Sequence, residues 1–181
     1  MPVRGPAGLM PAGVADGHRP DGRGLGISRV IRRKLTTLMR MNPARRALLV
    51  EATVWLALAR LALVLFPFRV VAAHLGEVCS PAEAAGRISQ AINNAADADT
   101  ARAVGWAVRL MAGKVPFKAV CLQQGVAAKL MLRRRGIRSA LHFGVAPRPE
   151  GLDAHAWLDT AGAKVTGYPV GDAFTELACW Y

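Results

Sequence analysis

Cys121 and His155 are the two residues of this chain whose side chains best fit a catalytic role. A cysteine thiolate is a strong nucleophile, and an imidazole can accept a thiol proton near neutral pH and later return it to a leaving amine. Neither residue type is specific by itself, because most buried cysteines are inert and a strand histidine often bonds only to backbone. The segments around the two residues therefore decide whether they can act together.

The segment 118–136 predicts a helix that begins close to Cys121. Apolar residues recur there at helical spacing, and the basic residues are expected on the opposite, solvated side. Pro116 prevents a much earlier start, and Gly136 supplies the left-handed residue that ends a helix. A cysteine in the first turn lies near free N–H groups and the positive end of the helix dipole, which favour a thiolate. The apolar residues are Leu122, Val126, Leu130 and Met131, and the basic ones are Lys129 and 133–135.

The residues after this helix predict an antiparallel meander that carries His155. Residues 137–145 alternate, the turn cluster 147–151 follows, and the chain returns through 152–159 with His155 in the second strand. A tight turn leads into a third strand at 164–168. His142 in the first strand could neighbour His155, although a strand residue without chemical duty is the favoured interpretation of it.

Several segments together resemble the protease component of lasso-peptide biosynthesis, a branch of the transglutaminase-like superfamily. The resemblance extends from Arg29 to the C-terminus and rests on AHAWLD (154–159), CL…LMLRRRGI (121–137), ALHFGV (140–145) and the helical lead-in 42–76. It implies an α+β fold. A helical N-terminal half would precede a transglutaminase/papain-like core, in which a nucleophile helix packs on a small antiparallel sheet.

The resemblance also implies a function. The chain would be a cysteine protease that removes the leader peptide from a ribosomally made lasso-peptide precursor, with Cys121 attacking the peptide carbonyl and His155 acting as base and then as acid. The implied partners are the precursor peptide, a separate leader-recognition protein and an ATP-dependent lasso cyclase. Nucleic acid is not expected as a partner, and no cofactor or metal is expected.

The residue that would orient the imidazole is the least certain part of this site. Family members with a full triad carry an aspartate on the strand after the histidine, but residues 163–167 contain no acid. Asp172 is the preferred candidate. Asp159 is the alternative, although about 13 Å of extended strand would separate it from His155, and a dyad stays open. The Cys121 N–H would hold the oxyanion, and the second donor is not assigned, since Gln123 and Gln124 fit equally well as ordinary helix residues.

The remaining sequence predicts three regions. Residues 1–26, rich in Gly, Pro, Ala and Arg, are expected to be a disordered tail; 27–113 are expected to be helical; 114–181 are expected to form the catalytic core. The predicted helices are a basic amphipathic helix at 28–41, a helix from the Asn42 cap to Phe66, a short one at 68–75, one from the Ser80 capping box to Ala95, and one from Asp99 or Thr100 to Gly113. The 42–66 helix is interpreted as central and buried, with Trp55 in the core.

Charge and cysteine content leave two alternatives open. The net charge of +12 suits a non-enzymatic basic adaptor at a membrane or on nucleic acid, and the same thiol could serve another transglutaminase-like acyl transfer or amide hydrolysis. Peripheral membrane contact through 28–41 also stays open, whereas Glu51 and Arg60 disfavour a transmembrane span at 42–66. Three widely spaced cysteines indicate neither a disulfide framework nor a metal site, so a cytoplasmic location is expected, with Cys79 and Cys179 as bystanders.

Overall fold

The computed structural model describes residues 41–90 and 95–181. Residues Asn42–Tyr181 form one compact unit, separate from Met1–Met41. The expectations for the 1–26 tail and the basic helix at 28–41 therefore fall outside the described residues, apart from Met41.

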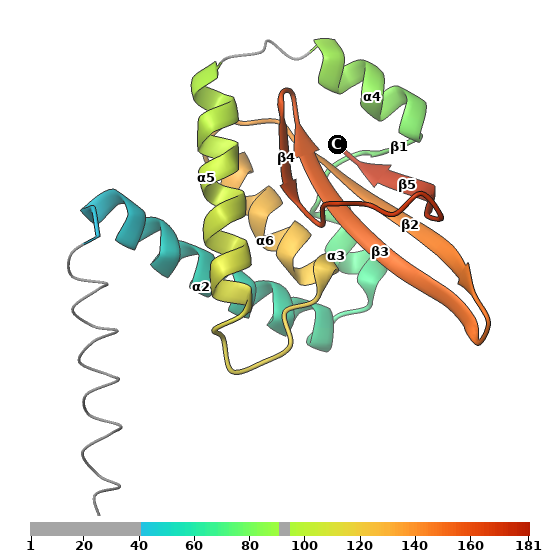
Figure 1. Ribbon diagram of the computed structural model, residues 1–181, viewed down its shortest axis with the longest axis horizontal. Helices are drawn as coiled ribbons and strands as arrows, with labels where there is room; N and C mark the ends of the chain where they lie inside the picture. The colour runs from blue at the N-terminus through green and yellow to red at the C-terminus, as the bar shows by residue number, and fades with distance from the viewer. Residues whose placement is uncertain (1–40, 91–94) are drawn as a thin grey trace, which may run out of the picture. The chain divides into compact units, whose positions relative to one another are not determined.

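Helices fill the first part of this unit and antiparallel strands the last part (Figure 1), which confirms the predicted α+β class. The elements in chain order are α2 (Pro43–Leu65), α3 (Phe68–Ala73), β1 (Val78–Cys79), α4 (Pro81–Gln90), α5 (Ala95–Ala112), α6 (Cys121–Arg133), β2 (Ala140–Arg148), β3 (Gly151–Thr160), β4 (Ala163–Thr166) and β5 (Thr175–Trp180).

The helix boundaries follow from local capping chemistry. The Asn42 side chain accepts a hydrogen bond from the Ala44 N–H at 2.9 Å, with Pro43 at the first helical position. At α4, the Ser80 hydroxyl and the Glu83 carboxylate exchange bonds with each other's backbone N–H, as the predicted capping box requires. Gly136 has a positive φ of 70° just after α6, which confirms the predicted stop.

The sheet has five antiparallel strands in the order β1-β5-β2-β3-β4. The predicted hairpin is present, with Gly144 opposite His155 and His142 opposite Trp157. Strand β5 was not predicted. The segment containing Cys179, for which the sequence predicted no strand, lies in the sheet between β1 and β2. It is held in the sheet from both sides.

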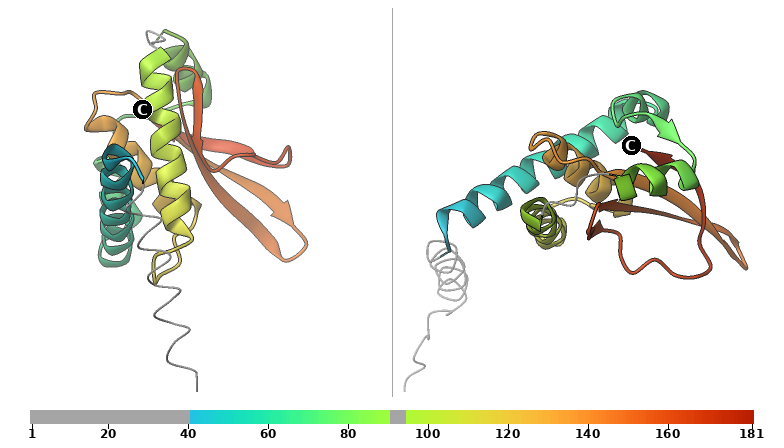
Figure 2. Two further views of the ribbon diagram at one scale, coloured as in Figure 1. Left: turned by 60° about the vertical axis from the view of Figure 1, so that its left-hand side comes forward. Right: turned by 90° about the horizontal axis from the view of Figure 1, so that it is seen from above.

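Helices α2, α5 and α6 lie on one side of the sheet (Figure 2). Close approach of α6 to β2 depends on Gly125, because a Cβ there would come within 2.5 Å of the Leu141 side chain. Gly105 likewise lets α5 approach the Val165 carbonyl of β4. The first contact sets how closely α6 approaches the strands, and the second does so for α5.

Helix α2 differs from its prediction as a central, buried helix. Only one side of it is buried, through Leu49, Ala52, Leu56 and Ala59, and it packs on α5 and α6. Trp55 is partly exposed and lines a surface groove instead of filling the core. Within the described part of the chain, α2 is the one helix long and apolar enough to cross a membrane, by length and composition alone.

Candidate active site

Cys121 is the first residue of α6, as the sequence predicted. The first backbone bond of the helix runs from the Gln124 N–H to the Val120 carbonyl at 3.1 Å. The N–H groups of Cys121, Leu122 and Gln123 therefore have no partner within the helix and stay near the sulfur. The thiol is neither fully buried nor fully exposed. This position suits a nucleophile whose charge the helix terminus stabilises.

Two glutamines after the cysteine shape the backbone before it. The Gln123 side-chain oxygen accepts the Val120 N–H at 2.7 Å, and Gln124 Nε2 donates to the Ala119 carbonyl at 2.7 Å. Both carboxamides thus hydrogen-bond to the backbone of the two residues that precede α6. The second N–H of the Gln124 amide is not used in this bond, and Gln123 acts mainly as a cap.

His155 is anchored by a backbone carbonyl. Its Nε2 lies 2.7 Å from the Gly167 oxygen, just after β4 ends. A carbonyl can only accept, so Nε2 must carry the proton, and Nδ1 of the neutral ring is left as the basic nitrogen. The rings of Trp157 and Phe174 flank the imidazole at 6.1 and 5.3 Å between centroids. These three groups orient the ring, and Nδ1 makes no hydrogen bond to the residues that the structure describes.

The thiol and the imidazole come from elements that pack together, α6 and β3. Strand alternation sends Leu141 and Leu158 to the side of the sheet that α6 covers, and His155 and Trp157 to the other side. The bond to Gly167 holds the imidazole at the edge of β3, beyond the end of β4. No hydrogen bond joins Cys121 to His155 within the described ranges 41–90 and 95–181. Since α6 covers the opposite face of the sheet, the thiol and the imidazole could meet only around this edge of β3.

Neither predicted aspartate orients His155 in the described part of the chain. Asp172 is exposed and makes no hydrogen bond to the imidazole. Asp159, as the strand spacing indicated, lies away from His155 and bonds to Tyr168 Oη at 2.9 Å and to His142 Nε2 at 3.0 Å. The group that bonds to the imidazole is instead the Gly167 carbonyl, 2.7 Å from His155 Nε2. The sequence showed that residues 163–167 contain no acid. It gave no signal that a main-chain carbonyl would bond to the imidazole instead.

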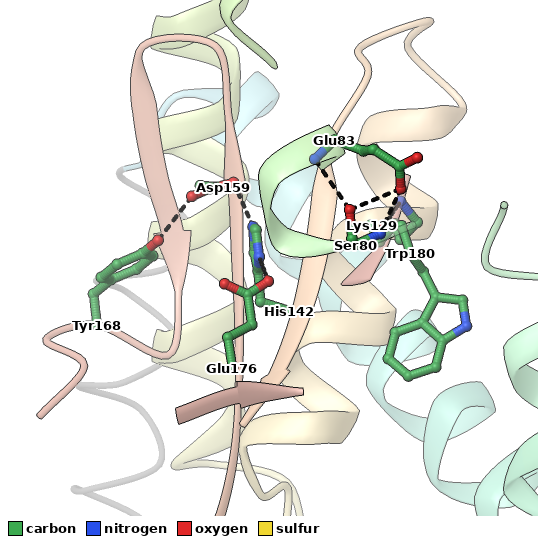
Figure 3. A network of polar contacts seen from close by, with 8 residues as sticks. All are labelled: Ser80, Glu83, Lys129, His142, Asp159, Tyr168, Glu176 and Trp180. Atoms are coloured by element: carbon green, nitrogen blue, oxygen red, sulfur yellow. Dashed lines mark hydrogen bonds and ion pairs between the residues drawn. The ribbon is translucent and has the colours of Figure 1, made fainter. Parts of the chain in front are cut away.

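His142 is the centre of a polar network on the same side of the sheet as His155 (Figure 3). Its Nδ1 lies 2.6 Å from Glu176 and its Nε2 lies 3.0 Å from Asp159, while its ring stacks on Trp157 at 5.5 Å. Burial alone lowers the pKa of His142, but the bonds to the two carboxylates outweigh burial and raise it. Burial, reinforced by Asp159, raises the pKa of Tyr168. The network favours a protonated His142 that forms ion pairs with both carboxylates.

Lys129 departs from its predicted place on the solvated side of α6. It is 5% exposed, and its ammonium donates to the Ser139 carbonyl at 2.6 Å and to the Trp180 carbonyl at 2.9 Å. Burial lowers its pKa to about 8. Figure 3 shows the side chain reaching the end of β5. The lysine thus ties the nucleophile helix to the C-terminal strand, which the helical periodicity did not reveal.

Cys79 and Cys179 are buried cross-strand neighbours of β1 and β5. Burial raises the pKa of the Cys179 thiol, so it is a poor nucleophile. Donor atoms of His142, Glu176 and Cys179 lie within 4.8 Å of one another. Both nitrogens of His142 are already bonded to carboxylates, however, so a metal would have to displace an existing ion pair. The cluster fits a charge network better than a metal site.

A helix headed by a cysteine, packed on an antiparallel sheet that carries an anchored histidine, defines the class of papain-like and transglutaminase-like folds. The family comparison agrees, since the model of the transglutaminase-like superfamily matches residues 62–179. The chain belongs to that superfamily, whose members are typically cysteine peptidases or acyl transferases. Comparisons with curated proteins and with solved structures gave no match.

Proposed function

We propose that this protein is a cysteine peptidase that cleaves the leader from a lasso-peptide precursor. One observation carries the catalytic part: the His155 Nε2–H is committed to the Gly167 carbonyl, which leaves Nδ1 as the base, and His155 lies on β3, the strand against which the helix beginning at Cys121 packs. Membership of a superfamily built on thiolate chemistry supports it. The substrate class rests on the resemblance of the segments around Cys121 and His155 to the lasso-peptide proteases.

The reaction begins with proton transfer from the Cys121 thiol to His155 Nδ1. The thiolate attacks the scissile carbonyl, and the oxyanion is stabilised by N–H groups at the start of α6. His155 then protonates the leaving amine, and water hydrolyses the thioester with the same imidazole as base. Throughout, the Gly167 carbonyl stabilises the imidazolium through Nε2–H, the task that an aspartate performs in a triad.

A neutral carbonyl stabilises an imidazolium less than a carboxylate does. The proposal includes a separate leader-recognition protein and an ATP-dependent cyclase as partners, in the cytoplasm. These partners would deliver the precursor to the edge of β3 and consume its product.

The test is cleavage of a precursor encoded beside this gene, with its recognition protein present, followed by mass spectrometry. Cys121→Ala and His155→Ala are expected to abolish cleavage, and Cys79→Ser serves as the matched cysteine control that retains it. Cys121→Ala cleaving at the wild-type rate refutes the nucleophile. Transfer of the acyl group to an added amine in preference to water would instead assign the protein to the transferases of the superfamily.

Alkylation gives a readout that needs no substrate. Iodoacetamide is expected to label Cys121 faster than Cys79 or Cys179, because those two thiols are buried. Preferential labelling of either buried cysteine would contradict the assignment. The His155→Ala variant should slow labelling of Cys121 near neutral pH if the imidazole assists its ionisation.

A further inference from the structure

A continuous apolar stripe runs along the outer side of α2 and is left uncovered by the described residues. Val50, Val54, Leu58, Leu61 and Leu65 recur at helical spacing and are 64, 51, 46, 53 and 61% exposed. Phe66, Phe68 and Val70 extend it onto α3 at 52, 36 and 40% exposed. Isolated apolar side chains on a surface are ordinary, but a stripe of this length marks an interaction surface.

The charges around the stripe are almost all positive. Helices α2 and α3 contain four arginines against one acid, Glu51. That acid is neutralised, because Arg135 bonds to its carboxylate and Arg134 lies 3.6 Å away. Arg60 is exposed one turn before Val64, and Arg69 is exposed beside Phe68. Arg46, one turn before Val50, is partly exposed. The surface is thus aliphatic along its centre and cationic at its margin.

We infer that this surface binds an anionic membrane, with α2 lying in the plane of the interface. Acyl chains suit aliphatic side chains, and anionic headgroups suit marginal arginines, each of which contributes on the order of 1 kcal/mol. The net charge of +12 acts in the same direction. Protein interfaces concentrate their energy in Trp, Tyr and Arg anchors at the centre, whereas Val and Leu occupy the centre here.

The helix cannot cross the bilayer while the fold stays intact. Its inner residues Leu49, Ala52, Leu56 and Ala59 are at most 5% exposed and pack against α5 and α6, so spanning the membrane would open the core. A groove between α2, α3 and α6, lined by Trp55, Leu65, Val71 and Leu130 among others, adds apolar surface beside the stripe. Attachment in the interface leaves the packing of α2 on α5 and α6 intact, and with it the fold that carries β3.

The experiment is vesicle flotation of the full chain at low and high salt. Vesicles of phosphatidylcholine with about a third phosphatidylglycerol are expected to bind the protein, pure phosphatidylcholine to bind it weakly, and salt near 0.5 M to weaken binding by screening the arginines. Val54→Glu and Leu61→Glu should each lower the partition coefficient at least about tenfold. Leu152→Glu, at an apolar site 73% exposed on the β2–β3 hairpin, is the matched control that should bind as wild type.

Circular dichroism and the thermal midpoint establish that each variant is folded. Equal binding by wild type and Leu61→Glu, or no binding to anionic vesicles at low salt, overturns the inference. A concentration-dependent dimer that Leu61→Glu dissociates, without vesicle binding, would assign the stripe to a second copy of this chain and also overturns it. Neither result bears on Cys121, whose cleavage assay is run without lipid.

Discussion

Replacing His142 tests the charge network directly. His142 is 6% exposed, and its imidazole lies between the carboxylates of Glu176 and Asp159, whose side chains are 22 and 25% exposed. His142→Leu keeps comparable volume but leaves Asp159 and Glu176 facing each other without a cation. Removing one partner of a buried pair costs about 3–5 kcal/mol, and the residual water contact of the carboxylates reduces this to about 2–3 kcal/mol here.

The pH dependence follows from the raised pKa of His142. Because the folded pKa lies above the unfolded value of 6.5, the stabilisation is fully present below pH 6.5 and is lost as the pH rises through the folded pKa. The gap in unfolding free energy between wild type and His142→Leu is therefore expected to be larger at pH 6 than at pH 9. Urea unfolding at both pH values measures it.

The control is His74→Leu, which changes an exposed histidine and should alter stability by less than about 0.5 kcal/mol. A third variant, His142→Leu with Asp159→Asn and Glu176→Gln, should recover part of the loss because it removes the two unpaired charges. A gap for His142→Leu that stays below about 1 kcal/mol, or that does not change with pH, would refute the argument that an imidazolium holds the network together.

Three further substitutions probe other features. Gly167→Ala places a Cβ 2.4 Å from the Ala156 carbonyl at a φ of +79°, so it should displace the carbonyl that orients His155 and lower the rate of cleavage more than the thermal midpoint explains. Gly86→Ala in α4 meets nothing within 4 Å and should raise stability by about 0.5–1 kcal/mol, measured by urea unfolding; a loss would contradict the helical geometry. Lys129→Met removes an ammonium whose pKa is about 8 in the folded protein, against 10.5 in the unfolded chain. The free energy of unfolding of wild type should therefore rise relative to that of the variant from pH 8 to 10. A difference between the two proteins that does not change with pH would refute the lowered pKa of the buried ammonium.

Local signals in the sequence predicted the helices and the hairpin well. Pro116 and the apolar spacing placed the start of α6 at Cys121, and the Asn42 and Ser80 caps placed α2 and α4, because each depends on residues only a few positions apart. The alternation of residues 152–159 identified β3 in the same way. Such features need no knowledge of distant partners.

Features that depend on long-range contacts were missed. Lys129 sits where helical periodicity favours solvent, yet two carbonyls from Ser139 and Trp180 satisfy its ammonium. Strand β5 was missed because its pattern becomes informative only with β1 and β2 on either side. The Gly167 carbonyl opposite His155 is a main-chain group, which no residue type encodes.

The placement of β5 has a kinetic consequence. Its neighbours are β1, about a hundred positions earlier in the chain, and β2, so the sheet cannot close until two distant segments have met. Pairing over such separations is slow, because loop entropy is lost before the contacts form. Until then the helical half would present its apolar surfaces to water, and a chaperone or a bound surface that shields them would shorten the time in which the molecule can aggregate.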